Sequence, residues 1–317
     1  MGNYILKRML SLLPVLAIVM FVVFIIIHIT PGDPAAIILG EGASPEQIKD
    51  LRIKMGLDAP IYLQFVSWAG NLFQGDFGDS YFLGKPVLNA FLENLGPTVS
   101  LAILAQIIGV VLAIVFGIIA AKNKGKFKDE TIIGVSLLGI SIPSFLLGSL
   151  LILIFAVKIQ LFPVSGYQPL SSGIWGHLKY LILPAITLGA IQAAIITRMT
   201  RSSLIDTLSE NFIKTAKAKG LKQNSIILKH ALRVSFLPVL TVIGESFGGL
   251  VTGAAVTEAL FNIPGLGQLI ISAVSRRDYA VIQGSILLIT ITYVLLNLLV
   301  DLLYAVIDPR VRNSYRS

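Results

Sequence analysis

The segment 99–121 has the sequence VSLAILAQIIGVVLAIVFGIIAA and contains no charged residue. An α-helix needs about 20 consecutive apolar residues to cross the roughly 30 Å hydrocarbon core of a bilayer, so this segment predicts a transmembrane helix. Five further apolar runs occupy residues 9–29, 131–157, 180–196, 234–260 and 279–307. The sequence therefore predicts an all-α membrane protein with six transmembrane helices.

The composition of the whole chain agrees with this assignment. Of its 317 residues, 55% are hydrophobic and 13% are charged, and the mean hydropathy is +0.83. The charged fraction is about half that of an ordinary soluble domain. The chain has no cysteine, which excludes a disulfide framework and a thiolate metal site, and three widely spaced histidines leave little to hold a metal. We therefore expect no catalytic domain, metal or cofactor in this chain.

The distribution of Lys and Arg predicts the orientation of the six helices. With both termini on one side of the membrane, 17 of the 25 basic residues fall in segments on that side, and eight fall on the other side. Four of those eight lie in the long segment 30–98, which can cross the membrane largely regardless of charge. Short basic loops stay cytoplasmic, so both termini are predicted to be cytoplasmic. The net charge of +8 then reflects topology and attraction to membrane lipid, and we expect no nucleic-acid partner.

The long segment between the first two apolar runs is predicted to fold as an extracytoplasmic subdomain. Ser44-Pro45-Glu46-Gln47 is typical of a helix start, and Gly56 is suited to ending that helix. Residues 61–68 predict a second, amphipathic helix. The subdomain is either a lid on the membrane or a docking surface for an extracytoplasmic partner. The expected organisation is thus 1–30 for the N-terminal end and first helix, 31–98 for this subdomain, and 99–317 for a five-helix core.

A short cytoplasmic helix is predicted at about 207–220, between the fourth and fifth apolar runs. Thr207 and Glu210 match a capping box, and Gly220 suits the left-handed position after a helix end. The helical spacing places Phe212, Ile213 and Ala216 on one face and the neighbouring lysines elsewhere, as an apolar knob ringed by positive charge. Such a face either lies on anionic lipid or fills a groove of a partner protein.

Motifs for catalysis are absent or better explained by packing. No G-x-x-x-x-G-K-[ST] phosphate loop occurs in the sequence. The string Gly244-Glu245-Ser246-Phe247-Gly248 matches G-x-S-x-G, but no histidine lies near it in the predicted topology. The glycines instead form two overlapping small-x-x-x-small pairs that predict close helix packing: Gly244 with Gly248, and Gly249 with Gly253.

Three acidic residues fall well inside the apolar runs, where charge is costly and usually functional. They are Glu245, Glu258 and Asp301. Glu258 and Asp301 lie nearer the ends of their runs, so we expect structural roles for them. Glu245 lies nearest the middle of its run, and Glu245 and Ser246 are candidates for a transport pathway. Glu245 either contacts a cationic substrate group in a water-filled pathway or hydrogen-bonds to a neighbouring helix.

Several stretches together resemble one family. The sequence Ala216-Lys217-Ala218-Lys219-Gly220, followed by Leu237-Pro238, resembles the signature loop of ABC-importer permeases. The chain is also similar to the peptide/nickel branch of that family, the dipeptide and oligopeptide type, from Tyr4-Ile5-Leu6-Lys7-Arg8 to Asp308-Pro309-Arg310. The similar stretches between these ends are Pro31-Gly32-Asp33-Pro34, Gly56-Leu57-Asp58, Gly75-Asp76-Phe77-Gly78-Asp79-Ser80, Arg198-Met199-Thr200-Arg201, Pro264-Gly265-Leu266-Gly267 and Arg277-Asp278-Tyr279.

The resemblance implies a membrane permease subunit of an ATP-driven importer in a bacterial or archaeal cell membrane. It implies a second homologous permease subunit, two ATP-binding subunits that hold ATP and Mg²⁺, and an extracytoplasmic solute-binding (lipo)protein that delivers peptides. The cytoplasmic helix would then be a coupling helix seated in a groove of an ATP-binding subunit. The residues implied in coupling are Glu210, Phe212, Ile213, Thr215, Ala216, Lys217 and Gly220. Glu245 lies where the family is expected to have an uncharged residue, which makes it a candidate for substrate preference.

Other functions are left open by the residues. The same family also imports nickel and metal chelates. An ion-coupled secondary transporter or channel would need ion sites near the membrane midplane and often has broken helices in paired halves. The sequence has one mid-span carboxylate and no paired halves. A purely structural membrane subunit is a third function, which the long outer segment and the cytoplasmic helix disfavour.

Overall fold

The computed structural model describes residues 2–29, 32–40 and 42–307, and their side chains except for 2–12, 252–253 and 300–307. The chain forms two compact units. Unit 1 comprises residues 1–96 together with 268–317, and unit 2 comprises residues 97–267. The three-part organisation expected from the sequence stays a prediction.

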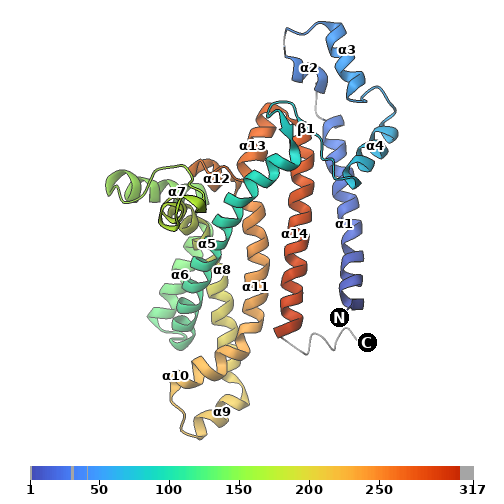
Figure 1. Ribbon diagram of the computed structural model, residues 1–317. Helices are drawn as coiled ribbons and strands as arrows, with labels where there is room; N and C mark the ends of the chain where they lie inside the picture. Colours follow the sequence, from blue (N-terminus) through green and yellow to red (C-terminus); the bar gives the residue numbers. More distant parts are fainter. Residues whose placement is uncertain (1, 30–31, 41, 308–317) are drawn as a thin grey trace. The chain divides into compact units, whose positions relative to one another are not determined.

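Unit 1 combines the N-terminal helices with the last helix of the chain (Figure 1). Within it, α1 packs along α14, and the side-chain amide of Gln283 donates to the carbonyl of Val23 at 3.0 Å. The elements that begin in this unit are α1 (Gly2–Ile29), α2 (Pro34–Leu39), α3 (Pro45–Lys54), α4 (Ile61–Phe73), β1 (Asp79–Ser80), β2 (Lys85–Pro86), α5 (Val87–Lys122) and α14 (Tyr279–Ile307).

Unit 2 is built around one long helix, α8, which packs against α6, α7 and α11. Two of its segments are π-helical and one is a 3₁₀ turn. Beyond most of α5, its elements are α6 (Phe127–Ser141), α7 (Ser144–Leu151), η1 (Ile152–Lys158), η2 (Leu170–Ser172), α8 (Ile174–Ser209), α9 (Asn211–Ala218), α10 (Gln223–Ser225), η3 (Ile226–Ala231), α11 (Leu232–Gly253), α12 (Ala255–Phe261) and the start of α13 (Leu266–Arg276).

Four helical segments of the described chain are long and apolar enough to cross a membrane. They are Val87–Lys122, Ile174–Ser209, Gln223–Val251 and Tyr279–Leu299, and a bent helix pair raises the number to five. A shorter apolar helical segment covers Leu13–Ile29. The fold is therefore mostly helical, as the sequence predicts, and α14 has the same bounds as the predicted run 279–307.

The predicted run 131–157 is not one straight helix. Helices α6 and α7 are bent by 102° at a break after Ser141. Pro143 disfavours helical backbone at the residue before it, and Ile142 is extended, with φ −78° and ψ 122°. The pair is thus a broken span or a re-entrant segment. The predicted run 234–260 is also divided, because α11 ends at Gly253 and α12 begins at Ala255.

The outer part of unit 1 has the local structure expected from its sequence. Ser44 caps α3 with a complete capping box, since its hydroxyl accepts from the Gln47 amide and the Gln47 side chain accepts from the Ser44 amide. Gly56 follows α3 with a φ of +69°. The β1–β2 hairpin is tied to the start of α14 by Ser80, whose hydroxyl donates to Asp278 at 2.5 Å.

Close packing in unit 2 depends on glycines that the sequence analysis did not single out. A Cβ atom on Gly117 would lie 2.6 Å from the Cβ of Thr200, and one on Gly189 would lie 2.8 Å from the carbonyl oxygen of Ala105. These contacts join α5 to α8, and any side chain there would force the helices apart.

The glycines that were predicted to pack behave differently from one another. Gly244 and Gly248 are buried, whereas Gly249 is exposed and has open space where a Cβ would lie. The surroundings of Gly253 lie outside the described residues. The packing role of the Gly249–Gly253 pair therefore stays a prediction.

Candidate functional site

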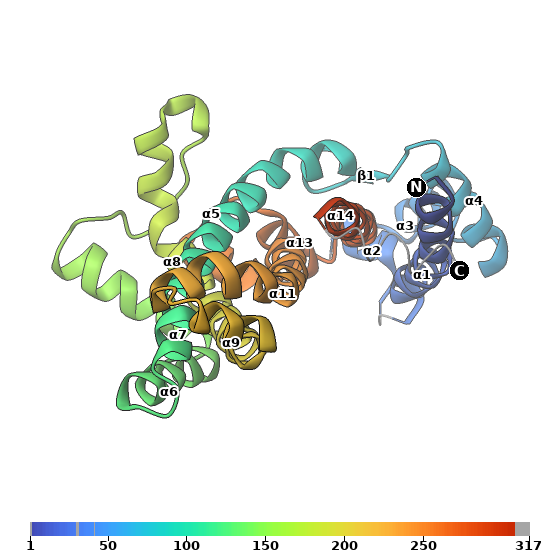
Figure 2. The same ribbon diagram turned by 90° about the horizontal axis from the view of Figure 1, so that it is seen from below.

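The first candidate site is the segment that joins α8 to η3 through α9 and α10. Helix α9 lies against α8 and η3, and Figure 2 shows it from below. Glu210 is extended between α8 and α9, with φ −67° and ψ 152°. Gly220 follows α9 with a φ of +76°, which confirms the left-handed position expected from the sequence. The segment therefore turns sharply at both ends of an eight-residue helix.

Helix α9 is held by a buried cluster on its inner side. Ile213 has no exposed surface, and Ala216 is 9% exposed. The other buried members of this cluster are Ala121, Leu204, Ile226, Ile227 and Ala231. They come from the end of α5, from α8 and from η3, so α9 is packed onto the ends of three helices.

The prediction that Phe212, Ile213 and Ala216 form one exposed apolar knob is wrong. Ile213 and Ala216 point into the chain, while Phe212 is 43% exposed. Successive helical residues differ by about 100° in direction, so a helix that buries Ile213 turns Phe212 toward the outside. The outward surface of α9 combines Phe212 with exposed Thr215 and Lys217, and exposed Glu210 and Gly220 lie at its two ends.

The capping box predicted at Thr207 and Glu210 does not form. Helix α8 continues through Ser209, so Thr207 lies in its last turn, buried, and donates to the carbonyl of Ser203 at 2.8 Å. Helix α9 has no side-chain cap. The sequence therefore placed the helix here but put its start about four residues too early.

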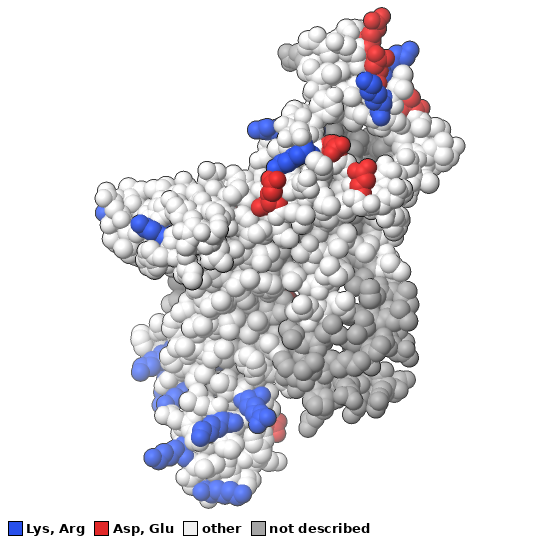
Figure 3. All heavy atoms as spheres, viewed as in Figure 1, with Lys and Arg blue, Asp and Glu red and all other residues white. Residues whose placement is uncertain are grey.

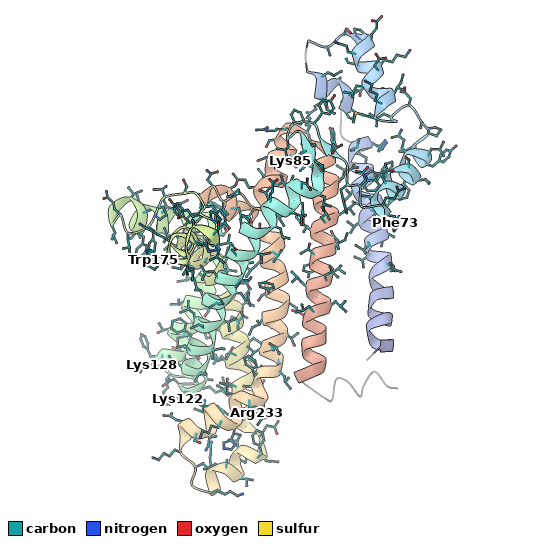
Figure 4. All side chains as sticks on the ribbon, in the orientation of Figure 1. Phe73, Lys85, Lys122, Lys128, Trp175 and Arg233 are labelled. Carbon is teal, nitrogen blue, oxygen red and sulfur yellow. The ribbon has the colours of Figure 1, made fainter. Side chains whose placement is uncertain are left out.

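Basic side chains are concentrated at the α9 end of unit 2. Figure 3 shows them around the bottom of this unit, and Figure 4 shows Lys122, Lys128 and Arg233 there, with Trp175 at the opposite end. Lys122 donates to Asn224 at 3.0 Å, which joins the end of α5 to α10. This end has the charge expected of a cytoplasmic surface.

A buried ion pair that the sequence analysis missed lies near this end. Arg201 of α8 donates to both carboxylate oxygens of Asp129 at 2.5 and 2.7 Å. Asp129 is 2% exposed and also accepts from the amide of Gly125 at 2.9 Å. The pair fixes the start of α6 against α8. In the sequence this region was marked only by the family-like stretch Arg198-Met199-Thr200-Arg201.

The second candidate site is the middle of α11. Here Ser246 is hydrogen-bonded to neighbouring helices, whereas Glu245 forms no such bond to the described residues. Ser246 is half-buried and accepts from the Gln106 side chain of α5 at 3.1 Å, while its hydroxyl bonds to the Ile243 carbonyl at 2.9 Å. Gln192 of α8 donates to the Ser246 carbonyl at 3.3 Å. Ser246 therefore joins three helices. Glu245 points the other way and is exposed.

Glu258 has the structural role expected from its position near the end of an apolar run. Its buried carboxylate accepts from the Thr98 hydroxyl at 2.6 Å and from the Gly267 amide at 2.8 Å. Thr98 also accepts from the Leu266 amide at 2.8 Å. A Cβ on Gly265 would lie 2.3 Å from this carboxylate. Asp301 lies outside the residues whose side chains are described.

An open cavity of about 610 Å³ lies between α6, α8 and α11. Its lining is mostly apolar but includes two arginines, Arg201 in the ion pair and the exposed Arg198. The complete lining is Ile133, Ile195, Arg198, Met199, Arg201, Ser202 and Val242. Within the described residues, no three His, Asp or Glu side chains are grouped so as to hold a metal ion.

Comparison with known proteins covers nearly the whole chain. Residues 113–313 match the family model described as the binding-protein-dependent transport system inner membrane component, and residues 1–102 match the N-terminal model of the same systems. A probable peptide ABC transporter permease protein of Sinorhizobium fredii is 42% identical over 98% of this chain and 100% of its own length. The glutathione transport system permease protein of Escherichia coli K12 is 42% identical over 98% and 99%.

Solved structures share the fold at lower identity. An inward-facing methionine ABC transporter aligns with a TM-score of 0.56 and 17% identity over 70% of this chain and 97% of the matched chain. An amino acid ABC transporter crystallised with histidines aligns with a TM-score of 0.51 and 14% identity over 70% and 94%. At this identity the likeness concerns the arrangement of the helices.

Proposed function

Because the chain belongs to the family of binding-protein-dependent transport system inner membrane components, we propose that it forms half of a peptide import pathway. As a member it is a membrane permease subunit of an ABC transporter, a transport component and not an enzyme. The observation that carries the peptide assignment is the 42% identity, over almost full length, to permeases named for peptide and glutathione transport.

The proposed topology has six spans with both termini cytoplasmic. The five candidate spans found by length are completed by α1, whose 28 residues are enough to cross a bilayer. The concentration of Lys122, Lys128 and Arg233 at one end of unit 2 supports a cytoplasmic location for that end. A bacterial or archaeal cell membrane is the proposed location.

Helix α9 is the proposed coupling helix. Its exposed residues Phe212, Thr215 and Lys217, with Glu210 and Gly220 at its ends, would contact a groove of an ATP-binding subunit. Ile213 and Ala216 would transmit that subunit's movement, since they are buried against the ends of α5, α8 and η3. The two ATP-binding subunits would hold ATP and Mg²⁺, and this chain would hold neither.

The proposed assembly also needs one partner in the membrane and one outside the cell membrane. A second homologous permease would complete the pathway, and a solute-binding (lipo)protein would deliver peptides to the outer surface of unit 1. Helices α3 and α4 offer that surface several exposed side chains, including Tyr62, Val66 and Phe73.

Reconstituted transport tests the proposal. The complex purified through this chain would be placed in liposomes with ATP inside, and loaded binding protein with a radiolabelled tripeptide outside. We expect uptake that requires ATP and the binding protein. Uptake that persists without ATP, and that stops when an ion gradient across the membrane is dissipated, would contradict the proposal. It would favour a secondary transporter.

A further inference from the structure

One face of α11 is exposed along most of the helix. From Val234 onward its exposed residues recur at intervals of three or four, which places them on one side. We call this set the α11 stripe: Val234, Pro238, Thr241, Glu245 and Gly249. Two of its five members are polar, and one of these is a carboxylate within an apolar candidate span.

The exposed face of α5 is a useful contrast within the same unit. Between residues 99 and 121 it carries only apolar side chains: Ile103, Ile107, Val111, Leu112, Val115, Phe116 and Ile119. Such a face suits lipid hydrocarbon. A carboxylate in the hydrocarbon core costs several kcal/mol, and it normally faces a bundle interior or water-filled cavity. The α11 stripe therefore does not have the character of a lipid-facing surface.

The polar side chains of the stripe make no hydrogen bond to another helix of the described chain. Glu245 has no hydrogen bond or ion pair among the described residues. Thr241 donates only to its own helix, to the carbonyl of Leu237 at 3.4 Å. The neighbouring polar side chains Gln106 and Ser246 bond to each other, and neither bonds to Glu245. The described chain thus supplies no partner for Glu245, and its carboxylate is left to interact with groups from outside this chain.

The surface beside the stripe is open. Val242, one helical turn before Glu245, lines the cavity of about 610 Å³ between α6, α8 and α11. Arg198, exposed in the same cavity, is a second charged group that hydrocarbon would not accommodate. Two faces that meet at Val242 thus carry charged groups: Arg198 near the cytoplasmic end of α8, and Glu245 one turn further along α11.

We propose that the α11 stripe faces the translocation pathway and that Glu245 is a specificity-determining residue that binds the α-ammonium group of a peptide in transit. The inference rests on the proposed peptide-import function and names one contact within it. A carboxylate only accepts hydrogen bonds, and an ammonium only donates them, so the pair forms a charge-assisted bond. A free amino terminus is the cationic group that all unblocked peptides share.

Water access is tested with the cysteine-free chain, which allows single cysteines without background from this subunit. Variants Glu245→Cys and Thr241→Cys, with matched controls Ile107→Cys and Val111→Cys, would be treated in the assembled complex with a membrane-impermeant methanethiosulfonate reagent. We expect modification of the first two and at least tenfold slower modification of the controls. Equal protection of all four positions would overturn the assignment of the stripe to the pathway.

The ammonium contact is tested by transport of a matched pair of peptides. Proteoliposomes would receive saturating binding protein loaded with a free tripeptide or its N-acetylated form, so that differences arise at the permease. A lost charged hydrogen bond corresponds to about tenfold or more, so we expect wild-type uptake to favour the free peptide by about that factor. Glu245→Gln should bring the ratio close to one.

Two control variants separate this contact from other effects. Glu245→Asp keeps the carboxylate and should keep most of the preference, while Glu130→Gln makes the same substitution at an exposed carboxylate of α6 and should leave the ratio unchanged. An unaltered ratio in Glu245→Gln, with wild-type peptide uptake intact, would overturn the inference but not the proposed function. Loss of the second permease from the Glu245→Gln complex alone would also overturn it, because Glu245 would then pair with that subunit.

Discussion

Replacing Ile213 by alanine should uncouple the cytoplasmic helix from the membrane helices. Ile213 is fully buried in the cluster that joins α9 to α5, α8 and η3. Truncating a buried isoleucine to alanine costs about 2–5 kcal/mol. Helix α9 has eight residues, and isolated helices shorter than about 12–15 residues are marginal in water, so α9 depends on this cluster. The lost free energy therefore weakens the packing of α9 on the other helices, and the membrane spans stay in place.

The lower bound of that loss already predicts a large effect. About 2 kcal/mol shifts the equilibrium between attached and detached α9 by about 30-fold. Hydrogen exchange of the amides of residues 211–218, measured in the complete complex in nanodiscs, should accelerate by about that factor. Peptide uptake should fall much more than ATP hydrolysis, because the ATP-binding subunits would move without carrying the spans with them.

The matched control is Lys214→Ala, since Lys214 is exposed on the same helix and bonds only to Asn211. It should leave both the exchange of residues 211–218 and the uptake per ATP near the wild-type values. Unchanged exchange and unchanged uptake in Ile213→Ala would refute the argument that the buried cluster transmits the movement of α9.

Three further changes test other contacts of the chain. Gly220→Leu places a bulky residue at a φ of +76°, which costs roughly 1–2 kcal/mol, so uptake should be lost while the chain stays in the membrane, as checked by fractionation. Arg201→Gln leaves the buried Asp129 carboxylate unpaired and should cost about 3–5 kcal/mol, seen as a lower Tm in detergent, and adding Asp129→Asn should recover most of it. Thr98→Val removes bonds to Glu258 and to the Leu266 amide and should also lower the Tm, whereas an unchanged Tm would count against this buried contact.

The positions of most membrane helices could be predicted from the sequence, because apolar length is a local property. The run 279–307 coincides with α14, and the run 99–121 lies inside α5. The bend in the run 131–157 was missed because hydropathy averages over Pro143, which interrupts the backbone without lowering the apolar content. Helix ends near Thr207 were misplaced for a related reason, since packing of α8 extends it past a local capping signal.

The sequence predicted where the candidate sites lie, but not which of their residues are buried and which are exposed. The pattern of residues 207–220 predicted a short cytoplasmic helix, and Gly220 follows that helix in the left-handed conformation expected. Which side of α9 is buried depends on Leu204, Ile226 and Ile227, which come from other elements and carry no local signal. The separation of Glu245 from Ser246 likewise depends on Gln106, which meets Ser246 from α5.

A photo-cross-linking measurement tests the central claim, that α9 docks on an ATP-binding subunit, most directly. A benzophenone amino acid would replace Phe212, which is exposed on α9, and in a second variant Phe116, which is exposed on the apolar face of α5. Cells would be irradiated and the cross-linked products of each variant identified by mass spectrometry. The account predicts that position 212 captures an ATP-binding subunit with a phosphate loop and that position 116 does not. Capture of lipid alone from position 212, in complexes that contain the ATP-binding subunits, would contradict it.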